Sequence, residues 1–207
     1  MSGKYLVFDG IDGAGKSTLL SAVAIEFSKR NKSVETIRFP SERTVGKLIR
    51  DSMIDTNNVS PYAYMHLFAA DGLDNENRIQ SWLNEGKTIL SDRHTISSGF
   101  VYQSDLYPIE AVLSVIKPGM FTTPTAFFIL DVPSDVAISR INTRKGTSDI
   151  YETRKVQQIE IRRARYGSLW NIMQNVYTLD GTRPVHENVK TVFTVIDHID
   201  ALAIKLN

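Results

Sequence analysis

The 207-residue chain contains no cysteine. This absence excludes a disulfide framework, a zinc site built on thiolates, an iron–sulfur cluster and a cysteine nucleophile. The chain also lacks an excess of charge of either sign, because 24 Lys and Arg residues stand against 23 Asp and Glu residues. A balance so close to neutral gives no bulk attraction toward nucleic acid or acidic membranes. We therefore expect neither of them as a partner.

Long apolar runs are missing as well. No run approaches the roughly 20 residues that a membrane-spanning helix needs. The first residues do not show the pattern of a signal peptide, so the default expectation is a cytoplasmic location. Hydrophobic residues make up 42% of the chain and charged residues 23%, which is typical of a globular protein. The length fits one domain spanning residues 1–207.

Short β-rich runs alternate with helical patterns along the chain. We expect strands at residues 5–8, 34–39, 88–90, 126–132 and 176–180, and helices at 16–31, 45–53, 61–85, 109–116, 135–142, 153–174 and 186–206. This alternation favours an α/β fold with three layers, in which helices cover both faces of a parallel sheet of about five strands. In such folds, ligands bind at the carboxyl ends of the strands.

Residues 10–17 read GIDGAGKS, which satisfies the phosphate-loop pattern G-x-x-x-x-G-K-[ST] between an expected strand and an expected helix. Glycines let backbone N–H groups approach phosphate oxygens, and the helix N-terminus adds partial positive charge. Lys16 can bridge the β- and γ-phosphates, and Ser17 can ligate Mg²⁺. The nucleotide-binding set is Gly10, Ile11, Asp12, Gly13, Ala14, Gly15, Lys16, Ser17 and Thr18. Because GTPases, motors, transporters and small kinases all carry this loop, it predicts only ATP or GTP binding.

Further segments, collinear with the loop, resemble the thymidylate kinase family over nearly the whole chain. They are FDGIDGAGKST at 8–18, RFP at 38–40 followed by Arg43, LFAAD at 67–71, DRH at 92–94 with Ser97 and Ser98, RKG at 144–146 and RARY at 163–166. The resemblance implies a P-loop kinase fold with a short lid at about 142–153. It also implies transfer of the ATP γ-phosphoryl to the 5′-phosphate of dTMP with Mg²⁺, in a homodimer.

The chemistry of two neighbouring residues supports this interpretation independently. Phosphoryl transfer between two anions needs cations that hold both phosphates. Arg93 follows an expected strand that ends in Asp92, so it should lie beside the phosphate loop, where arginine can bind phosphate with two donors. Arg93 could instead pair with Asp92. Asp92 itself could lie near Mg²⁺ and, like Ser17, take part in binding the ion. Alternatively, Asp92 could be the N-cap of a helix.

The resemblance assigns further residues to the acceptor nucleotide. It implies that Asp12 contacts the sugar 3′-hydroxyl or a Mg²⁺-bound water, and that Asp9 lies behind Asp12 and orients these groups. It also implies that Phe68 stacks on the base, although a phenylalanine on a helix more often belongs to the hydrophobic core. The remaining acceptor candidates are Phe39, Arg43 (rather than Arg38), Arg93, Ser98 at the base edge, and Tyr102 (or Val101) on the deoxyribose.

The stretch from Asn142 to Thr153 is polar and basic, as a mobile lid or a solvated loop would be. Arg144 or Lys145, or alternatively Arg154, could neutralise charge on the transferred group, because position 13 in the phosphate loop is glycine. Lid closure would exclude water from the reaction. The later run of Arg162, Arg163 and Arg165 reads as a solvated helix face.

Two positions depart from the family pattern. Gly72 stands where the family carries the arginine that recognises the thymine edge, and Ile150 stands where many relatives carry another arginine. A missing polar partner weakens base discrimination, so phosphorylation of another nucleoside monophosphate is an alternative. A GTPase-like switch is a non-enzyme alternative, although we find no N-K-x-D guanine motif. A scaffold without activity is a third possibility, against which the intact Lys16, Ser17, Asp12 and Arg93 argue.

Overall fold

The structure is a computed structural model that describes residues 3–54, 59–143 and 156–205. The strands are β1 (Lys4–Asp9), β2 (Val34–Arg38), β3 (Thr88–Asp92), β4 (Ala126–Asp131) and β5 (Val176–Asp180). They form one parallel sheet in the order β2-β3-β1-β4-β5. The apolar runs in β1, β3 and β4 are almost completely buried because these strands lie in the middle of the sheet.

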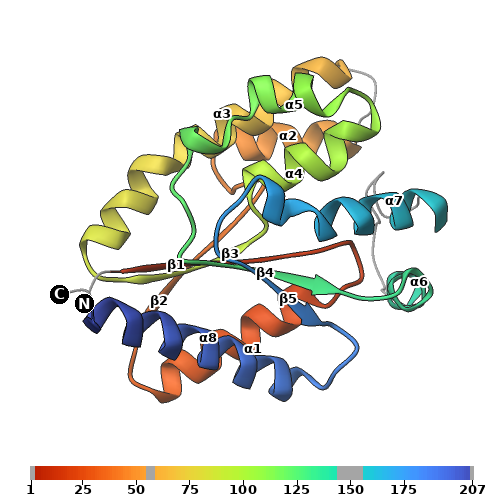
Figure 1. Ribbon diagram of the computed structural model, residues 1–207. Helices are drawn as coiled ribbons and strands as arrows, with labels where there is room; N and C mark the ends of the chain where they lie inside the picture. The colour runs from red at the N-terminus through yellow and green to blue at the C-terminus, as the bar shows by residue number, and fades with distance from the viewer. Residues whose placement is uncertain (1–2, 55–58, 144–155, 206–207) are drawn as a thin grey trace.

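Helices cover both faces of this sheet. They are α1 (Lys16–Lys29), α2 (Thr44–Ile54), α3 (Pro61–Asn84), α4 (Thr95–Tyr102), α5 (Ile109–Val115), α6 (Ser134–Asn142), α7 (Val156–Gly167) and α8 (Val185–Lys205). Figure 1 shows α1 and α8 on one face, and α3, α4 and α7 on the other. The three-layer α/β/α prediction is therefore confirmed. In the described part of the chain, no helix has the length and apolar character needed to cross a membrane.

The start of α3 shows how the local sequence sets an element. Pro61 occupies the first turn, where its missing N–H costs nothing, and the Ser60 side chain accepts a hydrogen bond of 3.2 Å from the N–H of Ala63. The helix then continues for 24 residues. It carries Phe68 into a second hydrophobic cluster, separate from the main core on the sheet, together with Ile49, Met53 and Phe121.

Two helices differ from the sequence prediction. Helix α4 was not expected at all, since residues 95–102 were read only as part of a motif. The helix predicted over 153–174 is wrong at its C-terminal end, because α7 stops at Gly167 and a 3₁₀ turn follows at Leu169–Asn171. The Ser168 hydroxyl donates to the carbonyl of Arg165 at 2.9 Å and so satisfies a carbonyl at the helix end.

The strand order brings two chain segments together at one edge. β1 lies between β3 and β4, and Phe8 of β1 is in register with Asp92 of β3. The N–H of Arg93 donates to the carbonyl of Phe8 at 3.0 Å. The loop after β1 and the residues after β3 are therefore neighbours at the carboxyl edge, where open α/β sheets bind their ligands.

Candidate active site

The loop between β1 and α1 depends on glycine for its shape. Gly10, Gly13 and Gly15 have φ angles of 146°, 84° and 100°, in a region that side chains disfavour. A Cβ on Gly10 would also press into the carbonyl oxygen of Leu130, and one on Gly13 into that of Ala137. The loop thus packs tightly against β4 and α6 and leads directly into the N-terminus of α1.

Lys16 reaches back over this loop. Its Nζ donates to the carbonyls of Gly10 and Ile11, both at 3.0 Å, and lies 3.9 Å from Oδ1 of Asp12. Burial, followed by the charge of Arg93, lowers the pKa of the Lys16 ammonium. The lysine therefore lies over the loop at the position from which it can contact bound phosphate.

Ser17 and Asp92, the two predicted metal ligands, are in contact. The Ser17 hydroxyl donates to Oδ2 of Asp92 at 3.1 Å. A hydroxyl and a carboxylate are both oxygen ligands of the kind that Mg²⁺ prefers. The described residues contain no group of three or more His, Cys, Asp or Glu side chains able to hold a metal. Because the pair supplies two oxygen ligands, it fits an ion whose other ligands come from nucleotide phosphates and water.

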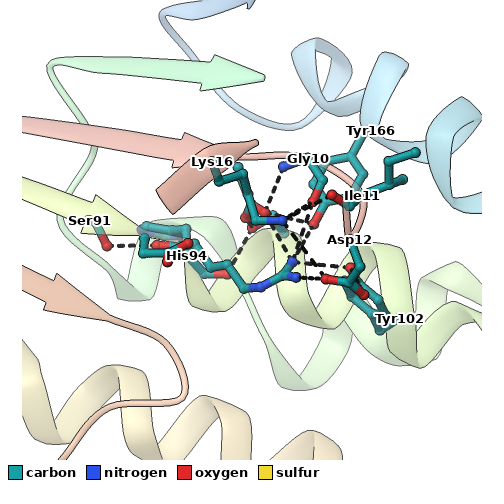
Figure 2. A network of polar contacts seen from close by, with 12 residues as sticks. Gly10, Ile11, Asp12, Lys16, Ser91, His94, Tyr102 and Tyr166 are labelled. Carbon is teal, nitrogen blue, oxygen red and sulfur yellow. Dashed lines mark hydrogen bonds and ion pairs between the residues drawn. The ribbon is translucent and has the colours of Figure 1, made fainter. Parts of the chain in front are cut away.

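Arg93 lies at the centre of a polar network, and its own backbone has a φ of 75°, which is uncommon for a residue with a side chain. Its Nη1 is 3.1 Å from the hydroxyl oxygens of Tyr102 and Tyr166 and 3.3 Å from Oδ1 of Asp9. Its Nη2 donates to Oδ1 of Asp12. Arg93 pairs with these carboxylates and not with Asp92. Figure 2 shows Asp12, Lys16, Tyr102 and Tyr166 gathered in this network.

Asp12 joins the loop to α4. Its Oδ2 accepts a hydrogen bond of 3.3 Å from the Tyr102 hydroxyl. Burial alone would raise the pKa of Asp12, but the charges of Arg93 and Lys16 outweigh burial and hold this pKa below its ordinary value. It is therefore Tyr102, rather than Val101, whose side chain reaches Asp12. Sequence reasoning named Asp12 and Tyr102 but did not predict their contact.

Three residues in this region were missed as site residues: Ser97, Tyr166 and Arg140. Ser97 and Tyr166, which were quoted only as parts of motifs, both donate to Asp9, which is completely buried. Arg140 of α6 donates to the carbonyl of Ala14 at 3.2 Å and to that of Gly181 at 3.1 Å. It thereby ties the phosphate loop to the turn after β5.

Comparisons with known proteins decide the family. A family model described as thymidylate kinase matches residues 8–192. A "Probable thymidylate kinase" of Caldivirga maquilingensis is 33% identical over 201 residues, covering 93% of each chain. A thymidylate kinase of Janthinobacterium sp. (strain Marseille) is 30% identical over 205 residues, covering 95% of this chain and 98% of its own. The chain belongs to the thymidylate kinase family. It is accordingly a nucleoside monophosphate kinase, for which the family implies ATP as the phosphoryl donor.

Three of the residues predicted to bind the acceptor, Asp12, Arg93 and Tyr102, lie in the network described above. The other predicted acceptor residues of this thymidylate kinase family member fall into two groups. Phe39, Phe68 and Ser98 are buried, with Phe68 inside the second hydrophobic cluster. Arg43 is exposed, and its guanidinium makes a two-donor ion pair with Asp74. Arg38 is exposed as well. Arg38 pairs with Glu42 and Arg43 with Asp74, and neither of these ion pairs belongs to the Arg93 network.

Gly72, where the family pattern has arginine, lies tightly against two side chains. A Cβ at this position would come within 2.5 Å of the Phe121 ring and 2.6 Å of the Thr95 hydroxyl. No side chain can therefore enter here without displacing its neighbours. Arg78 does not replace the missing group, because its guanidinium lies over the Trp82 ring, 4.1 Å from the centroid.

The arginine run on α7 is not a solvated face, so that interpretation is wrong. Arg162 is only 2% exposed and pairs with Asp105, which Arg165 also contacts. Arg163 pairs with Asp131 at the end of β4. These ion pairs fasten α7 over the carboxyl edge of the sheet. The predicted lid residues Arg144 and Lys145 and the alternative Arg154 lie outside the described residues.

Proposed function

We propose that this kinase phosphorylates dTMP to dTDP, with ATP as donor and Mg²⁺ as cofactor. One observation carries the proposal: Arg93 lies beside the phosphate loop, in a network that also contains Asp12 and Lys16. A phosphate-binding loop and a second cationic group at the same edge are what a reaction between two phosphates requires. The names of the relatives support dTMP as the acceptor.

Each side of the site holds one nucleotide. The loop N–H groups, the N-terminus of α1 and Lys16 bind the donor phosphates. Arg93 binds the acceptor phosphate, one oxygen of which attacks the γ-phosphorus as the bond to the β,γ-bridging oxygen breaks, with ADP as the leaving group. The cations offset the repulsion between the two anions, so positioning and electrostatic stabilisation supply most of the catalysis.

The proposal also assigns residues to the metal ion, to the transferred phosphoryl group and to the acceptor sugar. Ser17 and Asp92 would hold Mg²⁺, which neutralises phosphate charge when bound. Arg144 or Lys145 of the lid would stabilise the transferred group. Asp12 contacts the acceptor sugar, and Tyr102, whose hydroxyl already contacts Asp12, packs on the deoxyribose.

The residues assigned to the base support a second candidate acceptor. Phe68 stacks on the base and Ser98 meets its edge, whereas Gly72 offers no side chain and its surroundings are closed by Thr95 and Phe121. Without a guanidinium at this edge, another deoxynucleoside monophosphate is a competing substrate. Because the chain belongs to a family of enzymes, we do not retain the nucleotide-switch alternative. The homodimer, the single domain and the cytoplasmic location stay predictions.

A coupled assay with dTMP, dUMP, dCMP, dGMP and dAMP tests the proposal. We expect the highest kcat/KM with dTMP, and a loss of turnover of about 10²–10³-fold in Lys16→Ala, as when one preorganised charge-stabilising group is removed. Lys29→Ala, at an exposed lysine of the same helix, is the matched control and should keep full activity. If dTMP were the poorest acceptor, the thymidylate assignment would fail. Unchanged turnover in Lys16→Ala would refute the role of the loop.

A further inference from the structure

The two amino groups of the Arg93 guanidinium have different surroundings. Nη1 faces a fixed wall that consists of Asp9 and Gly10 from β1 and the following loop, Tyr102 from α4, and Tyr166 from α7. Nη2 instead faces Asp12, whose side chain is 16% exposed. An incoming phosphate can therefore compete for the Nη2 side, while the Nη1 side stays bound to the protein.

The wall is organised around the buried carboxylate of Asp9. Oδ1 of Asp9 accepts from the N–H of Gly10 at 2.8 Å, from the Tyr166 hydroxyl at 2.7 Å and from Nη1 of Arg93 at 3.3 Å. Oδ2 accepts from the Ser97 hydroxyl. A buried carboxylate needs such donors, because it has lost its hydration. Arg93 is the most distant of the three donors on Oδ1.

The Tyr166 oxygen lies between the cation and the carboxylate. It donates a hydrogen bond to Asp9 and accepts one of 3.1 Å from Nη1 of Arg93. Its position does not depend on Arg93, because α7 is fixed through the ion pairs of Arg163 with Asp131 and of Arg165 with Asp105. The hydroxyl thus satisfies part of the Asp9 charge that would otherwise draw the guanidinium inward.

We propose that Tyr166 is a positioning residue for Arg93: its hydroxyl keeps the guanidinium from collapsing onto Asp9, so that Nη2 is presented to the acceptor phosphate. This inference rests on the proposed function only in that Arg93 binds the phosphate of a nucleoside monophosphate. Removing the hydroxyl leaves Asp9 with one donor fewer, and the guanidinium moves toward it. The acceptor phosphate then loses its best-aligned partner, while the donor site is unchanged.

Isothermal titration of Tyr166→Phe with dTMP and with thymidine tests this role. We expect the Kd for dTMP to rise about tenfold, which corresponds to about 1.4 kcal/mol. The Kd for thymidine, which lacks the phosphate, and the KM for ATP should stay within twofold. In an Arg93→Ala background, the substitution should change the Kd for dTMP by less than twofold, because the two side chains act as one unit.

The control is Tyr177→Phe, which removes the hydroxyl of a half-buried tyrosine on β5 whose ring packs against Phe128. It should leave the Kd for dTMP, the Kd for thymidine and the KM for ATP unchanged. If Tyr166→Phe yields too little folded protein, Ser97→Ala carries the test, since it removes the other hydroxyl on Asp9 and should give the same phosphate-specific loss.

Other outcomes would overturn the positioning role. Equal losses for dTMP and thymidine, or an undiminished effect in the Arg93→Ala background, would show a merely structural contribution, and an unchanged Kd for dTMP would show none. If the assay panel selects another acceptor, the same comparison uses that monophosphate and its nucleoside. The assay panel thus tests the dTMP assignment, and the comparison of monophosphate with nucleoside tests the role of Tyr166, so either can fail without the other.

Discussion

His94, the residue after Arg93, is enclosed by aromatic rings. The ring centroids of Tyr5, Phe39, Phe121 and Phe127 lie 6.0–6.3 Å from that of the imidazole. Its Nδ1 accepts a hydrogen bond of 3.1 Å from the N–H of Ile96 and so caps α4. This capping role requires the neutral imidazole. Burial favours the same form and lowers the pKa of His94 to about 3.

The depressed pKa makes stability depend on pH. Because the pKa of His94 is about 3 when folded, well below the ordinary value of 6.5, the unfolded chain takes up this proton first as the pH falls. Its contribution to stability is complete above about pH 6.5 and is lost progressively toward pH 3. Between about pH 7 and pH 5, we expect the free energy of unfolding to fall by about 2 kcal/mol from this group alone.

Urea unfolding at several pH values measures this loss. His94→Asn keeps a side chain that can cap α4 but cannot titrate, so its stability should fall about 2 kcal/mol less over the same range. His198→Asn, at an exposed position on α8, is the matched control and should follow the unsubstituted protein. Parallel pH profiles for all three proteins would contradict the prediction.

At the scale of single residues, the sequence identified the groups that belong to a contiguous motif. Lys16 and Ser17 are readable because they lie in one short string, and Arg93 because it directly follows a strand. Asp9 and Tyr166 are 157 positions apart, and no local pattern relates a tyrosine on a late helix to the end of the first strand. Contacts of this range are set by the packing of elements, which a single sequence does not display.

The same reasoning explains which elements could be predicted. The strands were found because apolar runs of strand length mark buried parallel strands, as in β4. Helix α4 was missed because every residue from Thr95 to Tyr102 is buried, which leaves no polar face and hence no helical periodicity to detect. The end of α7 was placed too late because the apolar residues of the following turn continue the helical pattern.

Helix α3 approaches α4 closely at Gly72. Alanine favours helices by about 1 kcal/mol over glycine, so on propensity alone Gly72→Ala would be stabilising. The contacts at Thr95 and Phe121 oppose this gain, because overpacking a buried contact costs about 1–3 kcal/mol. We expect the contact to prevail and Gly72→Ala to lower the free energy of unfolding by up to about 2 kcal/mol, the difference between these two effects.

Gly167 provides the matched comparison for this prediction. A Cβ added there meets nothing within 4 Å, and the residue ends α7 without a positive φ. Gly167→Ala should therefore be neutral or slightly stabilising. Chemical denaturation of both variants separates helix propensity from packing. A Gly72→Ala protein more stable than the unsubstituted chain would show that α3 and α4 can move apart at little cost.

At the scale of the whole molecule, the site draws on distant parts of the chain. The phosphate loop follows β1, Arg93 follows β3, and Tyr166 belongs to α7, while β1 itself lies between β3 and β4 in the sheet. The main hydrophobic cluster likewise joins Leu6 of β1 to Ile196 of α8. Both the core and the site therefore need residues from both halves of the chain, so neither half can unfold alone without disrupting them.

Calorimetry should accordingly show one unfolding transition that moves as a unit when ligand binds. With dTMP at about 100 times its Kd, the free energy of unfolding should increase by about 2.7 kcal/mol. For a chain of this size, that raises Tm by about 5–10 °C. Sodium sulfate at the same ionic strength is the control for a general salt effect and should give a smaller shift. Two separate transitions, or a shift confined to part of the heat absorption, would mean that the acceptor site and the rest of the sheet unfold independently.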